Sequence, residues 1–256
     1  MYFSSNLSLG KKVIKALTLI ACIGISGTFS SAVSAQVAIN ATDRGWHRSD
    51  GQYLAGNLNY VVGNSAGNLF RNFFVFSIPA LQPGQTYFSA QLRLFNPAGG
   101  FSSGNLSETY TLYNVSTPIS TLLTNKIVGG AAGVNVYNDL GSGTAYGTRV
   151  FSSADNGQFV VINLNTQALA AINNAAGGQI AIGGAFTTLD GNNSTVEQAF
   201  ALTQNEPLSA TQLIVTATPE PDSLFLMLLS GGAVTIFASV KRQRKRYETA
   251  SCKSVV

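Results

Sequence analysis

Ionisable and catalytic side chains are scarce in this chain. Of its 256 residues, 10% are charged, one is histidine and two are cysteine. Because His47 is the single histidine, the sequence contains no histidine-based metal cluster. A Ser-His-Asp triad would have to use His47 itself, since no second histidine could serve as its base. Cys22 and Cys252 lie near the two ends, so the long stretch between them has neither thiol chemistry nor disulfides. The composition therefore argues against a histidine-ligated metalloenzyme and a thiol enzyme.

Positive charge is concentrated at the two ends. Of the 15 lysines and arginines, three precede residue 16 and six follow residue 240. Residues 36–217 hold six basic and eight acidic side chains, a net charge of −2. The formal net charge of +4 thus belongs to the ends, and the stretch between them predicts no nucleic-acid partner.

The first 35 residues have the pattern of a secretory signal peptide. Three lysines precede an apolar stretch over residues 16–25, and small residues surround Ala35. We expect signal peptidase to cut between Ala35 and Gln36 after export through the Sec machinery. Residues 36–217 would then form the exported domain.

A lipoprotein box gives a second interpretation of this leader. Leu19, Ile20, Ala21 and Cys22 have the form of such a box, which would place a lipid on Cys22. Apolar residues continue over residues 23–25, where a lipoprotein leader would turn polar. Cleavage by signal peptidase before Gln36 is therefore preferred.

The other end of the chain has the pattern of a membrane anchor. Residues 223–240 are 18 residues without a charge, enough for a helix that just crosses the hydrocarbon core. A basic cluster follows at once, and such charges remain in the cytoplasm. It consists of Lys241, Arg242, Arg244, Lys245 and Arg246. We therefore predict a cytoplasmic tail at residues 247–256.

Three residues before this span give the anchor a more specific meaning. Pro219, Glu220 and Pro221, followed by the apolar span and the basic cluster, resemble the PEP-CTERM sorting signal of exported bacterial proteins. The resemblance covers residues 218–246. It implies an exosortase-like processing enzyme as partner and cleavage at or near the tripeptide, after transient anchoring in the inner membrane. The tail at 247–256 is longer than in most such signals, and hydropathy alone is equally consistent with a plain single-pass anchor.

The exported domain has the pattern of an all-β fold. Short runs rich in β-branched and aromatic residues alternate with Gly, Asn, Asp and Pro turn residues, which is typical of a β-sandwich or jelly roll. The predicted strands are residues 69–78, 85–95, 108–115, 159–164, 179–186, 198–203 and 211–217. The first is apolar on both faces, as in a central strand, and the second places Phe88, Ala90, Leu92 and Leu94 inward.

One segment of this domain predicts a helix instead. Residues 165–176 are Ala-rich, begin with a capping Asn or Thr and stop at Gly177 and Gly178. We expect a single short helix across one edge or end of the sandwich. We find no linker within residues 37–217 and so expect one domain.

A second resemblance concerns the start of the exported domain. Asp43, Arg44, Gly45 and Trp46, then residues 71–79, then the pattern over 89–94 resemble the opening of β-sandwich modules described as carbohydrate-binding-module-like or DNRLRE-type. The match covers about fifty residues and consists of generic strand features. It implies a fold and says little about a ligand.

Aromatic residues in Gly/Asn-rich stretches are the candidates for ligand contact. Trp46 and Tyr53 could stack on the apolar face of a sugar while nearby amides bind its hydroxyls. Alternatively, Trp46 fills one end of the core and the tyrosines are half-buried strand residues. His47 could act as a general base with Asp43 or Asp50, but its polar, Gly-flanked surroundings favour a surface loop or strand end.

Two further motifs could bind ions. Asp190, Asn192 and Glu197 offer oxygen ligands at the short spacing of a calcium loop, although the same residues also make a good turn. Residues 141–147 are Gly-rich like a phosphate loop, but they lack its lysine and its strand-to-helix context, so we expect a flexible surface loop. The sequence predicts no cofactor and no resident metal.

Taken together, the sequence predicts a non-enzymatic exported protein of the cell surface or extracellular matrix. Proteins with this sorting signal accompany exopolysaccharide production, so that resemblance implies exopolysaccharide as a partner. The alternative is a discrete carbohydrate-binding module. An extracellular hydrolase is the third hypothesis, and it would need two acids close together in a cleft or His47 beside a nucleophile.

Overall fold

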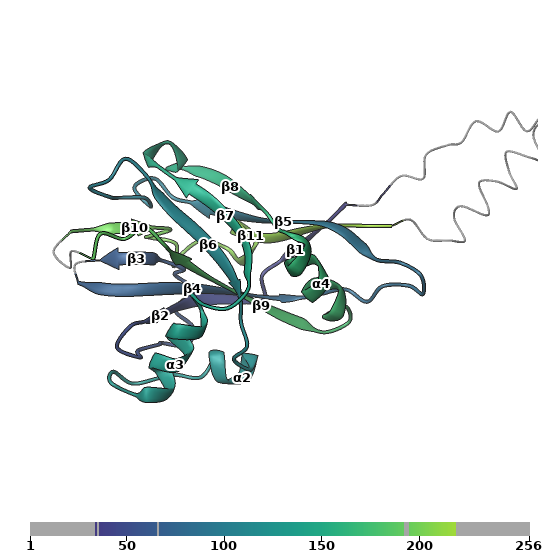
Figure 1. The fold of residues 1–256 in the computed structure, drawn as a ribbon, viewed down its shortest axis with the longest axis horizontal. Coiled ribbons are helices and arrows are strands. Elements are labelled where there is room, and N and C mark those ends of the chain that lie inside the picture. Colours follow the sequence, from purple (N-terminus) through teal and green to yellow (C-terminus); the bar gives the residue numbers. More distant parts are fainter. Residues whose placement is uncertain (1–33, 35, 66, 192–194, 219–256) are drawn as a thin grey trace, which may run out of the picture. The chain divides into compact units, whose positions relative to one another are not determined.

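Two antiparallel β-sheets stack face to face in the computed structural model, which describes residues 34, 36–65, 67–191 and 195–218 (Figure 1). The four-stranded sheet has the order β1 (Gln36–Asn40), β11 (Thr211–Ala217), β5 (Tyr87–Asn96), β8 (Gln158–Asn163). The described residues belong to one compact unit. The prediction of an all-β sandwich is confirmed.

The second layer is a seven-stranded sheet. Six of its strands follow the order β10 (Glu197–Ala199), β3 (Val62–Ser65), β4 (Asn68–Ser77), β9 (Gln179–Phe186), β6 (Glu108–Asn114), β7 (Ala145–Phe151). The seventh strand, β2 (Asp43–Arg48), lies off this path and pairs with β4. Several strands agree closely with the predicted ranges, and β9 and β11 agree at both ends. The prediction of a surface loop at 141–147 is wrong for its last residues, because β7 begins at Ala145 and pairs with β6.

The main core lies between the two sheets, because alternate residues of each strand point inward. Phe74, Leu92, Leu112, Val160 and Leu213 come from five different strands and are all at most 2% exposed. In β5 and β6, polar residues such as Gln91, Arg93 and Thr111 stand at the intervening positions, which explains why the period of two in the sequence predicted these strands correctly.

Strand β4 is apolar on both faces, as predicted for a central strand. Phe74 and Phe76 join the core between the sheets, whereas Phe73 and Val75 join a second buried cluster on the opposite face. That opposite face is covered by α2 (Ile119–Leu122) and α3 (Ala131–Asp139), which Figure 1 shows below the seven-stranded sheet.

The sequence did not predict these two covering helices. Leu122, Val136 and Leu140 pack on β4 from the helical side. Helix α3 contains Gly133, at which a Cβ atom would lie 1.9 Å from the carbonyl oxygen of Gly51. The glycine that weakens the helical pattern is therefore the residue that permits the close approach of α3 to β2 and its turn.

The predicted helix at 165–176 is present as α4 (Thr166–Asn174). Asn165 is its N-cap and accepts a hydrogen bond from the amide of Ala168 at 3.0 Å, as expected for a capping Asn. Ala168 and Ile172 face the core between the sheets. The side chain of Asn173 accepts a hydrogen bond from the backbone N–H of Tyr87 and donates one to its C=O, which attaches the helix to the start of β5.

One inward residue of β5 differs from the prediction. Phe88 is 49% exposed, and Tyr87 is buried in its place at 4%. The register between β5 and β11 shifts here, since Ser89 pairs with Thr216 but Tyr87 pairs with Ala217. This β-bulge reverses the faces of the first two residues, which strict alternation cannot anticipate.

Candidate functional site

Most of the sorting residues lie outside the described residues. These are Ala35, Pro219, Glu220, Pro221, the span at 223–240 and the basic cluster from Lys241 to Arg246. Gln36, the predicted first residue after cleavage, begins β1. Among the residues that the structure describes, no helix is both long and apolar enough to cross a membrane.

The two aromatic side chains considered for sugar contact are buried, which agrees with their alternative interpretation as core or strand residues and not with a sugar platform. Trp46 is 8% exposed and packs edge-on against Phe70, with ring centroids 5.1 Å apart. Tyr53 is 1% exposed and lies in the cluster beneath α2 and α3. Since neither ring presents a face to solvent, the stacking platform predicted at these residues is wrong. Trp46 instead fills a small core beside Val61 and Ala201.

His47 lies near the end of β2, which is one of the two places expected for it, but it belongs to the same buried region and not to a surface loop. Its ring is 0% exposed and stacks on Tyr53 at 4.5 Å. The Nε2 atom lies 3.1 Å from the carbonyl oxygen of Leu122, and Nδ1 has no hydrogen-bond partner within the described part of the chain. Burial lowers the pKa of His47 to about 4. The ring is therefore neutral at pH 7 and sealed from any substrate.

The residues of the calcium prediction form part of a carboxylate cluster. The amide nitrogen Nδ2 of Asn105 lies 3.0 Å from Glu108, 3.0 Å from Asp190 and 3.2 Å from Glu197. The backbone N–H of Asp190 also donates to both oxygens of Glu197 at 3.2 Å. Asn192 lies outside the described residues. Asp190 and Glu197 thus meet as predicted, and they are joined by Glu108, which the sequence did not suggest.

This cluster has acidic members and no basic one. The two ion pairs found in the described ranges, Arg48 with Asp50 and Arg149 with Asp155, do not involve it. Burial, together with the neighbouring charges of Asp190 and Glu108, raises the pKa of Glu197. Over the described residues, no group of three or more His, Cys, Asp or Glu side chains is arranged to hold a metal ion.

The outer face of the four-stranded sheet carries an ordered array of polar side chains joined by hydrogen bonds. Side chains on this face come from alternate residues of all four strands, and Ser89, Gln91 and Arg93 point outward as the sequence predicted. Among the residues that the structure describes, no helix lies over this sheet in Figure 1, in contrast to the face that α2 and α3 cover. Its side chains are therefore available to a partner.

Hydrogen bonds link these outward side chains into rows that run across the strands. In the first row Arg93 donates to Gln212 at 2.8 Å, and Gln212 donates to Asn40 at 3.0 Å. The next two rows hold one bond each, from Gln91 to Asn163 at 2.8 Å and from Ser89 to Thr216 at 2.9 Å. Each row matches the strand register, in which Asn40, Gln212 and Arg93 are direct neighbours.

Two phenyl rings lie at one end of this face. Phe95 and Phe159 are paired across β5 and β8 with ring centroids 5.1 Å apart. The guanidinium carbon of Arg93 lies 3.5 Å from the centroid of the Phe159 ring, and Phe159 is still 43% exposed. This arrangement can offer an apolar ring surface, a cation and several amides to one extended ligand.

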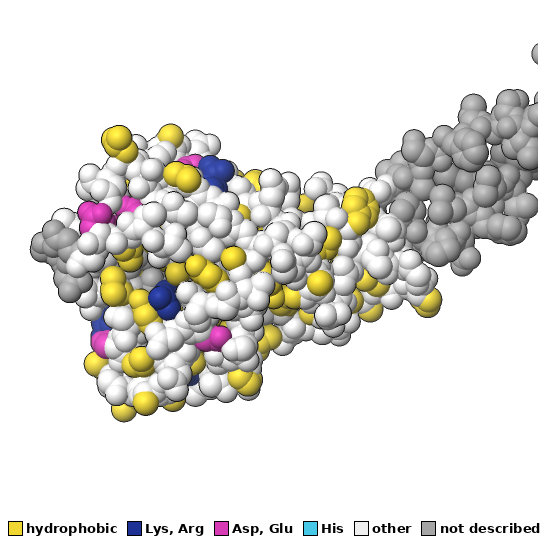
Figure 2. All heavy atoms as spheres, viewed as in Figure 1, with side chains coloured by type: hydrophobic (Ala, Val, Ile, Leu, Met, Phe, Trp, Pro, Cys, Tyr) yellow, Lys and Arg dark blue, Asp and Glu magenta, His cyan; other side chains and the backbone are white. Residues whose placement is uncertain are grey.

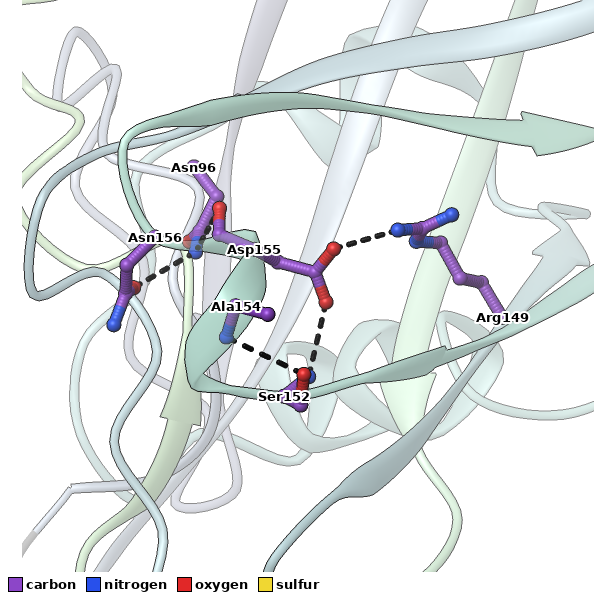
Figure 3. Close-up of polar contacts among 6 residues, drawn as sticks. All are labelled: Asn96, Arg149, Ser152, Ala154, Asp155 and Asn156. Atoms are coloured by element: carbon purple, nitrogen blue, oxygen red, sulfur yellow. Dashed lines mark hydrogen bonds and ion pairs between the residues drawn. The ribbon is translucent and has the colours of Figure 1, made fainter.

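The loops beside these rings are fixed by a polar network (Figure 3). Asp155 pairs with Arg149 at 2.6 Å and, with Ser152, forms the capping box of η1 (Ser153–Asp155). Asn96, at the end of β5, donates to the carbonyl of Asp155 at 3.2 Å and to the side chain of Asn156 at 3.0 Å. The ends of β5 and β8 are thus held in place next to Phe95 and Phe159.

Comparison with known proteins adds no identification. No protein-family model matches the chain, and no curated protein is significantly similar to it. The geometry of the described residues is therefore the basis for a functional proposal.

Proposed function

We propose that this chain is a non-enzymatic exported protein of the cell surface or extracellular matrix that associates with exopolysaccharide. The observation that carries the proposal is the uncovered face of the four-stranded sheet with its rows of amides and hydroxyls. Such groups exchange hydrogen bonds readily with sugar hydroxyls, and exposed phenyl rings stack on sugar faces. Charged side chains are also few and scattered on the face seen in Figure 2, so hydrogen bonds and ring contacts would supply most of the binding to a polysaccharide.

The proposed route follows from the two ends of the sequence. The Sec machinery exports the chain, residues 223–240 hold it in the inner membrane with its C-terminus in the cytoplasm, and an exosortase-like enzyme cuts near Pro219, Glu220 and Pro221. The product is released to the cell surface or the matrix.

A discrete carbohydrate-binding module is the second candidate. The sugar-binding surface of such a module would be the sheet face and not Trp46 and Tyr53, because the rings of both residues are buried. A module would bind one defined oligosaccharide with saturation, whereas a matrix protein would bind along a polymer.

The carboxylate cluster is a weaker basis for a hydrolase. Glu108 is 1% exposed and accepts hydrogen bonds from Ser103 at 2.7 Å, Asn105 at 3.0 Å and Thr188 at 2.5 Å. A carboxylate so enclosed has little freedom to transfer protons to a substrate. We therefore propose that this cluster fastens loops together.

Terminal sequencing and intact mass of the protein recovered from envelope and medium test the route. We expect a form that begins at Gln36 and ends near Thr218, which elutes with matrix polysaccharide until that polysaccharide is enzymatically degraded. Replacing Pro219, Glu220 and Pro221 by alanine should abolish the cut, and Ser223→Ala should preserve it. An uncut C-terminus in every variant would contradict release into the matrix.

A further inference from the structure

We propose that the outer face of the four-stranded sheet binds an extended acidic polysaccharide, with a sugar carboxylate on Arg93 and a sugar ring against Phe159. This inference names the ligand class and the surface for the function proposed above, and it rests on that function. It depends on three features: the unused donors of Arg93, the exposed ring beneath it and the polar rows that continue from it.

Arg93 differs from the other arginines of the domain in what it binds. Arg48 and Arg149 pair with carboxylates, and Arg44 and Arg71 donate to backbone carbonyls. Among the described residues, Arg93 donates to the side-chain oxygen of Gln212 alone, through Nη1. A guanidinium has five N–H donors, so the remaining edge of Arg93 can take a carboxylate in a bidentate contact.

The guanidinium of Arg93 is already held in position. It lies over the Phe159 ring at 3.5 Å, and Gln212 fixes one of its nitrogens at 2.8 Å. An arginine confined in this way loses little side-chain entropy when it binds, which favours affinity. The exposed part of Phe159 lies beside the same charge, so one sugar can offer its ring to Phe159 and its carboxylate to Arg93.

The polar rows extend the surface beyond a single sugar. They recur at every second residue along β5, at Ser89, Gln91 and Arg93. A polymer of repeating hydroxyl groups can meet successive rows in the same way, and their amides can both donate and accept. The face is therefore better suited to a chain than to a small ligand.

A second copy of this protein is a poorer occupant of the face. Packing the sheet against itself would bury the charge of Arg93 with no described carboxylate nearby to pair with it. It would also bury the amide rows against groups that cannot satisfy them all, and both effects cost free energy. A hydrated acidic glycan supplies the missing carboxylate and the missing hydroxyls.

Binding of the full-length chain in detergent to two matched polymers tests the inference. Polygalacturonate carries carboxylates, and its fully methyl-esterified form has the same backbone without the charge. We expect polygalacturonate to bind more tightly in affinity electrophoresis, with an affinity that falls as salt rises. Arg93→Gln and Phe159→Ser should each weaken binding by about tenfold, as expected for losing a charge-assisted or stacking contact. Arg93→Lys should recover part of the loss, because it restores the charge without the planar fork.

Lys126→Gln is the matched control, since it removes a half-buried cation that lies near α2 and away from this face. It should bind polygalacturonate like the unchanged protein. Equal binding of both polymers, unchanged binding by Arg93→Gln, or a dimer that Arg93→Gln dissociates would each overturn the inference. If the Arg93→Gln variant still elutes with the native matrix polysaccharide as the unchanged protein does, the proposed function stands and the proposed binding surface is wrong. If it binds no polysaccharide at all, both fail.

Discussion

Arg44 donates from Nη1 to the side-chain hydroxyl of Thr211 at 3.0 Å, a buried contact that joins β2 of one sheet to β11 of the other. The guanidinium is 0% exposed, and its other donors bind backbone carbonyls of the loops around it. These are the carbonyls of Leu58, Thr203, Glu206 and Pro207. Its charge also lies over the Tyr60 ring at 4.7 Å. The Arg44 side chain thus connects two strands and two loops through hydrogen bonds.

Arg44→Met should destabilise the domain strongly. The change leaves several buried carbonyls without a donor, and we expect the free energy of unfolding to fall by about 3 kcal/mol or more. Urea denaturation followed by tryptophan fluorescence measures it, since Trp46 is the single tryptophan and lies two residues away. Arg48→Met is the control on the same strand. Loss of its partly exposed ion pair with Asp50 should cost at most about 1 kcal/mol. Equal losses in the two variants would refute the role of Arg44.

Acid should weaken the domain through His47. Its folded pKa is about 4 and its ordinary pKa is 6.5, so the unfolded chain binds the proton more tightly. The stability that comes from keeping this ring neutral is complete above pH 6.5 and is lost as the pH falls toward 4, by about 3 kcal/mol in all.

Comparison with His47→Phe isolates this titration. Phenylalanine keeps an aromatic ring against Tyr53 but cannot take up a proton, so its stability should fall less between pH 7 and pH 4. Other groups titrate equally in both proteins and cancel in the difference. Parallel pH profiles for the two proteins would show that His47 is not responsible.

Glu197→Gln should have the opposite pH dependence. Because burial and the charges of Asp190 and Glu108 raise the pKa of Glu197, the folded state binds its proton more tightly than the unfolded state does. Ionisation of Glu197 therefore lowers stability at neutral pH, and the penalty disappears as the pH falls through its pKa. We expect Glu197→Gln to raise Tm at pH 7, with a gain that shrinks on acidification. Glu206→Gln, outside the cluster, should show no such gain, and a lower Tm for Glu197→Gln at pH 7 would contradict this account.

Gly184→Ala should disrupt the middle of the seven-stranded sheet. A Cβ atom at Gly184 would lie 1.9 Å from the hydroxyl of Tyr110 and 2.4 Å from the side-chain oxygen of Asn72. Those two groups share a buried hydrogen bond of 2.7 Å, which would have to break. We expect a loss of about 2–4 kcal/mol in chemical denaturation. Gly104→Ala, where a Cβ atom meets nothing within 4 Å, should change stability by less than about 0.5 kcal/mol. A small effect at Gly184 would mean that β9 can shift away from Tyr110.

The candidate site was predictable only in part. The alternation along β5 indicated that Ser89, Gln91 and Arg93 face outward, and they do. The rows exist because Gln212 and Asn163, far away in the sequence, lie opposite them in β11 and β8. A single sequence contains no signal for that pairing, since register depends on how distant strands meet.

The sequence by itself determined the features that depend on neighbouring residues: most strands, the two-faced character of β4, and the Asn165 cap of α4. The tertiary structure decided which surfaces are covered. His47 and Tyr53 stand in polar, Gly-rich surroundings that suggest exposure, yet both are buried. His47 and Tyr53 are buried because α2 and α3, about seventy or more residues further along, pack over β2 and β4. Burial depends on contacts between distant segments, whereas periodicity and capping report on adjacent residues alone.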